Sequence, residues 1–306
     1  MRVAVIIPNL HSPVIDEVIA AVLAQEAGVS VEVWVVGQDR YGKIPASPQV
    51  QTVVTPEPVY PGAARNIGAV HALDNVSEHA EETPVEVLIF LDADCIPQPG
   101  WLVTLLEAWQ AHPEAGAVSG AMLPQSDTFL LHCGQIANFH EHLVLNPAGT
   151  RQTLASFSLL VPRAVWEQVG GFNPHLRHVE DMDFTLRLGE RGWTLVFEPQ
   201  ARVYHRHARG TWQQFWSYAH RSGLWSIQVR QHYAAFYGMP FWTRWAWAWR
   251  LLSPFIAAAR TMQIYLRMPA FWRYFPCVPW VFLHKVAWCL GAAQGLRSVP
   301  PDLSFS

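Results

Sequence analysis

Short runs rich in β-branched and other apolar residues alternate with amphipathic segments through the first 120 residues of this chain. The runs predicted to be strands are residues 2–7, 31–36, 49–54, 85–91 and 115–119. Helices are predicted between them, opening at Ser12-Pro13 and Pro61-Gly62 and covering residues 99–112. Strands that alternate with helices at this spacing form a parallel sheet covered on both faces. The pattern therefore predicts an α/β fold that binds its ligand at the carboxyl ends of the strands.

The pattern becomes less regular after residue 120 and turns wholly helical near the end. The predicted elements are a helix at 126–145, a strand at 153–163, a helix at 180–191 and short strands at 194–197 and 201–206. From Gly210 onward the apolar positions recur at helical spacing and tryptophan is frequent. We therefore expect an α/β domain at residues 1–210 and a helical, Trp- and Arg-rich region at residues 211–306.

Charge is distributed unevenly along the chain. The net charge is only -3, but from Ala201 onward there are 12 Lys and Arg and a single acid, Asp302. The residues before Ala201 therefore hold 9 of the 21 basic residues and 23 of the 24 acidic ones. The same C-terminal part holds ten of the fifteen tryptophans. A basic, Trp-rich segment behind an acidic domain indicates two functions on one chain.

Cysteine usage and the N-terminus bear on the compartment. The four cysteines are widely spaced and form no CxxC pair, which argues against a zinc knuckle or a disulfide framework. They are expected to be buried as small hydrophobic residues. The N-terminal residues enter a strand directly, without the features of a secretory signal. We expect a cytoplasmic location.

Two aspartates, in Asp92-Ala93-Asp94, follow the apolar run at 85–91. Residues i and i+2 of an extended chain point to the same side, so both carboxylates can face one cation. Acids at the end of a buried strand are costly unless they meet positive charge. A hard divalent cation meets this need, and pyrophosphate oxygens can complete its shell. The alternative interpretation is a strand-ending turn without a metal.

A second acidic group, Glu180-Asp181-Met182-Asp183, opens the predicted helix at 180–191. The positive end of the helix dipole favours an ionised carboxylate at Asp181. An ionised carboxylate aimed at a cleft can remove a proton from an attacking hydroxyl. The alternative is plain helix capping, with Asp183 paired to Arg187 one turn later.

Two histidines, His205 and His207, end the last predicted strand and share one side of it. They could complete a metal shell or hold a phosphate, and a purely structural role is the alternative. At the start of another helix, Pro61-Gly62-Ala63-Ala64-Arg65 combines small residues with a planar guanidinium suited to phosphate or base edges. The chain has neither GxGxxG nor the P-loop pattern, and it has no HExxH or GxSxG.

Together and in this order, these motifs resemble glycosyltransferase family 2, whose members adopt the GT-A fold. The matching segments are VAVIIPNLHSP, PGAARNIGA, VLIFLDADCIPQPGWL, SLLVPRAVWEQVGGF, HVEDMDFTLRLGERGW and ARVYHRH. The resemblance covers residues 2–210. It implies a Rossmann-like, mostly parallel sheet with helices on both faces, to which the helical region is appended.

The resemblance implies a metal-assisted reaction. Asp92-Ala93-Asp94 matches the family's DxD motif, so Asp94 would bind Mn²⁺ or Mg²⁺, and Asp92 the metal or the donor ribose. His205 matches a histidine that in relatives helps to hold metal and diphosphate, and His207 is the alternative.

The resemblance also implies an inverting transfer of a hexosyl type. Asp181, with Glu180 beside it, matches the catalytic base, which would take the proton of an acceptor hydroxyl as the oxygen attacks the anomeric carbon. The metal would stabilise the charge of the departing nucleoside diphosphate.

Nucleotide binding is implied at three further positions. Arg65 matches an arginine near the nucleotide, and Pro8 lies in the strand-end loop under the base. Relatives usually show Asp-Asp-Gly-Ser after the second strand, where an aspartate contacts uracil. This chain reads VGQDR there, so Asp39 is the candidate for that contact and a UDP-sugar is the expected donor.

The C-terminal region raises the question of a membrane. Apolar stretches near 245–264 and 277–296 are interrupted by charged residues and proline, so neither is predicted to span a bilayer. Tryptophan with arginine is typical of interfacial helices. Our hypothesis is peripheral docking on the inner face of the membrane, which would bring the site to a lipid-linked acceptor. A helical cap or dimer interface is the alternative, and no nucleic-acid-binding module is present.

Two other functions compete with glycosyl transfer. A sugar nucleotidyltransferase would need a Gly-rich loop with Lys or Arg soon after the first strand, and IIPNLHSP has none. A non-catalytic module that binds a nucleotide sugar would tolerate the loss of Asp181.

Overall fold

The computed structural model describes residues 1–74, 84–124, 128–206, 210–298 and 303. They form two compact units. The α/β unit comprises Met1–Leu123 and Pro147–Arg206, and the helical unit comprises Pro124–Asn146 and His207–Phe305. The helical unit therefore receives a segment from the middle of the sequence as well as the C-terminal part.

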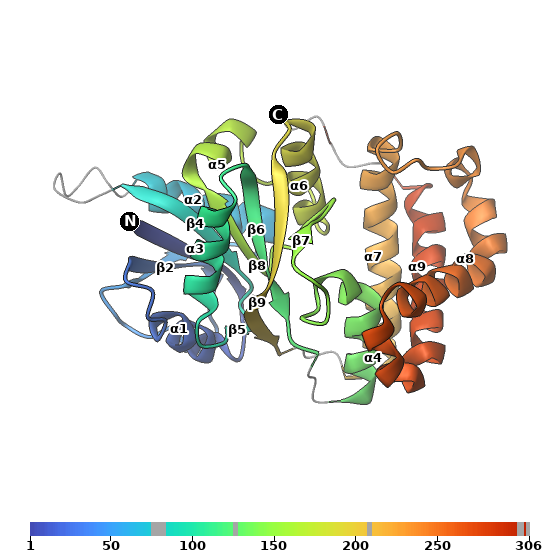
Figure 1. The fold of residues 1–306 in the computed structure, drawn as a ribbon, viewed down its shortest axis with the longest axis horizontal. Coiled ribbons are helices and arrows are strands. Elements are labelled where there is room, and N and C mark those ends of the chain that lie inside the picture. The colour runs from blue at the N-terminus through green and yellow to red at the C-terminus, as the bar shows by residue number, and fades with distance from the viewer. Residues whose placement is uncertain (75–83, 125–127, 207–209, 299–302, 304–306) are drawn as a thin grey trace. The chain divides into compact units, whose positions relative to one another are not determined.

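A central sheet of nine strands, with helices on its faces, organises the described α/β unit (Figure 1). The strands are β1 Arg2–Leu10, β2 Ser30–Gln38, β3 Val50–Val54, β4 Val85–Leu91, β5 Cys95–Pro97, β6 Ala115–Met122, β7 Gly149–Thr150, β8 Ser158–Pro162 and β9 Thr194–His205. Its helices are α1 Ile15–Leu23, α2 Pro61–Asp74, α3 Trp101–Ala111, α5 Arg163–Val169 and α6 Glu180–Glu190. The strand order is β3-β2-β1-β4-β8-β6-β9-β5, and β7 pairs with β9. The predicted α/β class is confirmed.

The sheet is parallel on one side and mixed on the other. β3, β2, β1 and β4 run parallel, whereas β8 runs antiparallel to both β4 and β6. The first residue of β8, Ser158, pairs with Leu91 at the carboxyl end of β4. β8 therefore starts at the carboxyl edge of the sheet and runs in the direction opposite to β4.

Burial explains why the strands read as apolar runs. Val3 to Ile7 of β1 and Val87 to Leu91 of β4 have no exposed surface, as expected for strands covered on both faces. The glycine of PGAARNIGA at position 68 lets α2 approach the sheet, since a Cβ there would overlap the side chain of Ile6. The small residues of this motif thus serve helix–sheet packing.

Four longer helices form the helical unit: α4 Phe129–Phe139, α7 Trp212–His232, α8 Ala246–Arg267 and α9 Val278–Gly295. Three 3₁₀ segments join them: η2 His140–His142, η3 Phe241–Arg244 and η4 Pro269–Cys277. α9 packs against α4, α7 and α8. It approaches α7 so closely that a Cβ at Gly223 would overlap the carbonyl oxygen of Trp288, and one at Gly291 that of His220.

Local chemistry fits this helical path. Thr211 and Gln214 form a capping box at the start of α7. Pro254 lies inside α8, where it cannot donate to the carbonyl of Arg250, and the hydroxyl of Ser253 donates to that oxygen at 2.9 Å instead. All four cysteines are free and buried, as predicted. Among the described residues, one helical stretch, Pro269–Gly295, has the length and composition of a membrane span, with a mean hydropathy of 1.2.

Candidate active site

The turn that follows β4 carries the Asp92-Ala93-Asp94 motif at the carboxyl edge of the sheet. Its backbone is fixed on both sides. The hydroxyl of Ser12 donates to the Ala93 carbonyl at 2.6 Å, and the N–H of Arg206 donates to the Asp94 carbonyl at 2.8 Å. Because these neighbours hold the carbonyls, the turn presents its carboxylates in a defined direction.

Asp94 and His205 are in direct contact in the candidate site. β5 pairs antiparallel with β9, which puts Cys95 opposite His205. This pairing brings the imidazole of His205 beside the turn that follows β4. Nε2 of His205 lies 3.0 Å from Oδ1 of Asp94. His205 is 5% exposed, and its ring stacks at 6.4 Å on that of Phe157. The two residues predicted to share a metal are thus adjacent, while His207 lies outside the described residues.

The donor atoms near Asp94 fit a divalent cation. One ligand atom each from Asp94, Cys95 and His205 lies within 4.8 Å of the others. Burial raises the pKa of the Cys95 thiol well above its ordinary value, and the neighbouring carboxylates raise it further. A thiol is also a soft ligand, whereas Mg²⁺ and Mn²⁺ favour carboxylate oxygens. What remains is a carboxylate and an imidazole. A cation held by few protein groups is typical of Mg²⁺ sites that take substrate phosphates as further ligands.

Arg65 bridges the two acidic motifs. Its Nη2 donates to Oδ1 of Asp92 and its Nη1 to Oε1 of Glu180, both at 2.6 Å. Arg65 is only 2% exposed. Burial opposes its charge, but the carboxylates of Asp92 and Glu180 outweigh this and raise its pKa. The turn after β4 and the start of α6 are therefore joined through one buried guanidinium. The contact with the nucleotide predicted for Arg65 stays a prediction.

Asp181 follows Glu180 and stands half-buried at the start of α6. Its Oδ2 accepts the N–H of Ser156 at 3.2 Å, and its Oδ1 accepts the N–H of Met182 at 2.8 Å. Burial, aided by the charge of Glu180, raises the pKa of Asp181 to about 7. A carboxyl group that titrates near neutral pH is suited to exchange protons with a substrate.

The start of α6 also contains the ion pair foreseen as the structural alternative. Asp183 is buried, and its Oδ2 lies 3.0 Å from Nε of Arg187. Arg187 also donates to the carbonyls of Val169 and Gly171, which anchors α6 on the preceding loop. Val179, just before the helix, has a φ of 60°, which is uncommon for a β-branched residue. Asp183 therefore has a structural role, which is to hold α6 on the preceding loop.

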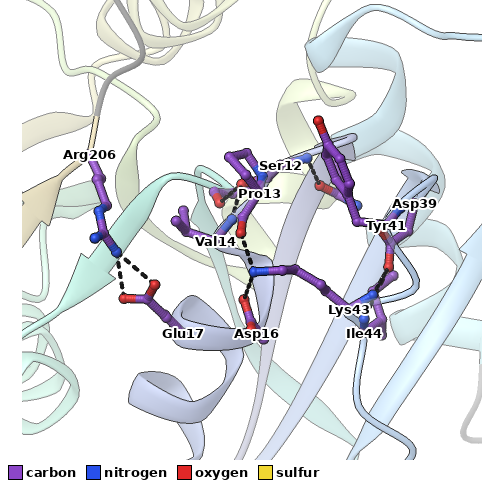
Figure 2. Close-up of polar contacts among 12 residues, drawn as sticks. Ser12, Pro13, Val14, Asp16, Glu17, Asp39, Tyr41, Lys43, Ile44 and Arg206 are labelled. Carbon is purple, nitrogen blue, oxygen red and sulfur yellow. Dashed lines mark hydrogen bonds and ion pairs between the residues drawn. The ribbon is translucent and has the colours of Figure 1, made fainter.

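The two predicted base-binding positions lie at the ends of β1 and β2. The strand-end loop predicted for Pro8 is wrong: Pro8 is inside β1, paired with Val36, because the strand continues for two more residues to Leu10. Its contact with a base stays a prediction. The Asp39 carboxylate accepts the backbone N–H groups of Tyr41, Lys43 and Ile44 (Figure 2). Burial raises its pKa, but these hydrogen bonds prevail and lower it. Asp39 thus organises its own loop, and its contact with a base stays a prediction.

Ion pairs tie the neighbouring loops together. Nζ of Lys43 donates to the Pro13 carbonyl and lies 3.3 Å from Oδ1 of Asp16 (Figure 2). Nη1 of Arg206 lies 2.6 and 2.7 Å from the two carboxylate oxygens of Glu17. The sequence interpretation missed these residues, and it also missed Ser12 and Ser156. Ser12 was visible only as a helix start, and Ser156 carries no sequence signal because its backbone makes the contact.

The chain has a mixed sheet with the strand order given above, one acidic motif after β4 and another at the start of α6. This combination defines a GT-A protein. The chain belongs to glycosyltransferase-like family 2, whose sequence profile matches residues 1–228. The family and the fold predicted from the sequence are both confirmed.

Relatives of known activity match part of the chain. It is 29% identical over 136 residues to N-acetylglucosaminyl-diphospho-decaprenol L-rhamnosyltransferase of Mycobacterium tuberculosis, covering 37% of this chain and 44% of that protein. It is 29% identical over 154 residues to the pre-mycofactocin glycosyltransferase of the same species, covering 48% of this chain and 30% of that protein. The chain spans less than half the length of these relatives.

One solved structure is similar over almost the whole chain. The mannosyltransferase PcManGT from Pyrobaculum calidifontis, in complex with GDP-Man and Mn²⁺, superposes with a TM-score of 0.62 at 18% identity. The similarity covers 96% of this chain and 87% of that one. At this identity the likeness establishes the fold.

Proposed function

We propose that this glycosyltransferase moves a hexosyl group from a nucleoside-diphosphate sugar to an acceptor hydroxyl with inversion at the anomeric carbon. The observation that carries the proposal is the Arg65 bridge between Asp92 and Glu180. It holds the acidic turn after β4 beside the helix that bears Asp181. The acidic turn proposed to bind the donor and the helix that bears the proposed base are thereby held together by Arg65.

Asp181 is the proposed general base. Its carboxylate accepts the proton of the acceptor hydroxyl while that oxygen attacks the sugar. The raised pKa, about 7, makes the carboxylate a stronger base than an ordinary aspartate and still leaves it ionised in a large fraction of molecules at neutral pH. The charge of Glu180 helps to raise the pKa of Asp181. The hydrogen bond that Glu180 accepts from Arg65 fixes the start of the helix.

Asp94 and His205 are the proposed holders of Mn²⁺ or Mg²⁺, with Asp92 on the same cation or on the donor ribose. When bound, such a cation neutralises charge on the diphosphate of the donor. Pro8, Asp39 and Arg65 are proposed to surround the nucleotide, for which UDP is the first candidate. The complex of PcManGT with GDP-Man and Mn²⁺ supports a donor and metal of these classes.

A lipid-linked hydroxyl is the proposed acceptor, reached from the cytoplasmic side at the inner face of the membrane. The name of the decaprenol-linked rhamnosyltransferase supports this class of acceptor.

The proposal is tested first by a donor screen. Thermal shift with Mn²⁺ is measured for several nucleotide sugars, because a ligand that binds the native state raises its stability. Release of the nucleoside diphosphate from the donor that binds is then assayed. A nucleotidyltransferase would release pyrophosphate with a nucleoside triphosphate and sugar phosphate as substrates, and a binding module would release nothing.

Asp181→Asn then tests the base. The variant should bind donor normally and lose roughly 10²- to 10⁴-fold in transfer rate. Glu190→Gln, at the exposed end of the same helix, is the matched control and should transfer at the normal rate. Normal turnover by Asp181→Asn would remove Asp181 from this role.

A further inference from the structure

One face of α8 is apolar and exposed along the length of the helix. Its large side chains recur every four or seven residues, which puts them within one third of the helix circumference. They are Trp247, Leu251, Phe255, Met262 and Leu266, with exposures of 58%, 66%, 71%, 56% and 62%. This set is called the α8 face.

The opposite side of α8 accounts for its packing in the helical unit. Trp249, Ala257 and Ile264 are buried, and the Trp249 ring meets that of Trp288 on α9 at 5.5 Å. Within this unit α8 lies on the side of α9 away from α7 (Figure 1). A helix on the surface of a soluble domain normally turns polar residues outward, so the α8 face departs from that pattern.

Exposed aromatic residues bound the α8 face at both ends. Before the helix, the rings of Phe241 and Trp245 meet edge-on, and Trp245 stacks on Trp247 at 5.8 Å. After the helix, Trp272 stacks on Phe275 at 6.1 Å. Phe241 and Phe275 are 72% and 59% exposed. Trp245 and Trp272 are each 45% exposed, and tryptophan, whose ring carries a polar N–H, is enriched where a protein meets the headgroup layer of a bilayer.

The charges near the α8 face have a single sign. Exposed arginines lie beside its two ends, at Arg244 and Arg273, and at one margin, at Arg250. Arg260 and Arg267 project from the opposite side of the helix. The sequence contains no Asp or Glu from residue 201 to residue 301. A protein partner would have to match both a broad apolar strip and cationic groups at its two ends and one margin. An anionic phospholipid surface offers both of these properties at once.

We propose that the α8 face docks on an anionic lipid bilayer, with α8 lying along the membrane surface and Arg244, Arg250 and Arg273 at the headgroups. The docking uses residues outside the site for sugar transfer. It therefore stands or falls independently of the proposed chemistry, and it would hold the enzyme where a lipid-linked acceptor is found.

Flotation of the full chain with vesicles tests the apolar part of this surface. The chain should float with phosphatidylcholine vesicles that contain phosphatidylglycerol. Leu251→Ser combined with Phe255→Ser should weaken vesicle binding by about tenfold or more, since both side chains would leave the lipid. Val54→Ser combined with Val70→Ser, which alters two exposed apolar residues of the α/β unit, should bind as the parent chain does.

The cationic groups beside the α8 face are tested separately. Arg250→Gln and Arg244→Gln should each weaken binding to the anionic vesicles by about fivefold. Arg191→Gln, an exposed arginine of the α/β unit, should have no effect. Circular dichroism of each variant verifies that the fold is kept.

Several results would overturn the proposal. A chain that stays in solution beside anionic vesicles, or that binds neutral vesicles equally well, contradicts it. Resistance of the membrane-bound chain to carbonate extraction would mean that it spans the bilayer. Serine substitutions in the α8 face that dissociate an oligomer and leave vesicle binding intact would show that a second copy covers the face.

Discussion

The two units of this chain use charge in opposite ways. The residues before Ala201 hold 23 of the 24 acids, and in the α/β unit several of these are directed inward, onto Arg65, His205 or Arg187. In the helical unit most arginines are exposed, and Arg244, Arg250 and Arg273 lie beside an exposed apolar face. The α/β unit organises a polar site by buried ion pairs, whereas the helical unit depends on close apolar packing. The comparison shows that the candidate site and the proposed docking surface are built on different physical principles in one chain.

Removing Arg65 should have the largest effect on stability. Arg65→Met leaves Asp92 and Glu180 without their shared cation, and the loss of one partner from a buried ion pair costs about 3–5 kcal/mol. Arg163→Met is the control, because Arg163 makes a surface pair with Glu167 worth at most about 1 kcal/mol. Urea denaturation measures both. Equal losses would mean that the bridge contributes no more than a surface contact.

Adding a side-chain atom where α7 and α9 touch should have the next largest effect on stability. Gly223→Ala forces a Cβ into the backbone of Trp288 and should cost about 1–3 kcal/mol of unfolding free energy. Gly189→Ala, in α6 where a Cβ meets open space, should instead raise stability by about 0.5–1 kcal/mol. Donor binding by the Gly223 variant is expected to survive. Loss of donor binding would mean that the two units depend on each other more than the comparison suggests.

The dependence of kcat/KM on pH should be gradual, because it follows the ionisation of Asp181. The base must be ionised, so kcat/KM should rise about tenfold per pH unit below pH 7 and level off above it. Because the folded pKa of Asp181 is raised above its ordinary value, the group favours the folded state at low pH. That contribution is lost as the pH rises through about 7. Because the pKa of Asp181 is about 7, kcat/KM that stays constant between about pH 5 and about pH 8 would mean that another group is the base.

Most of the fold was predictable because buried strands have a strong local signature. The parallel strands β1, β2, β3 and β4 lie within a few residues of their predicted ranges. The direction of β8 was not predictable, since its apolar run is the same for either direction. β9 was predicted as two strands around Pro199, and the structure has one strand whose pairing with β6 shifts there. β5 has three residues, too few for a periodic signal.

The site was predictable wherever a motif carried its own chemistry. Asp94 and His205 were proposed as partners and lie together. The Arg65 bridge could not be foreseen, because it joins residues 115 positions apart and a guanidinium suits a phosphate as well as a carboxylate. The backbone contact of Ser156 to Asp181 was also invisible, since every residue except proline offers the same N–H group.

Calorimetric titration of the donor, with and without Mn²⁺, tests the division of labour at the site most directly. Asp94→Ala should lose the Mn²⁺-dependent part of donor binding, and Asp181→Asn should keep it in full while its transfer rate falls by about 10²- to 10⁴-fold. Equal donor binding by both variants, or equal loss in both, would contradict a site in which one acidic motif holds the donor and the other takes the proton.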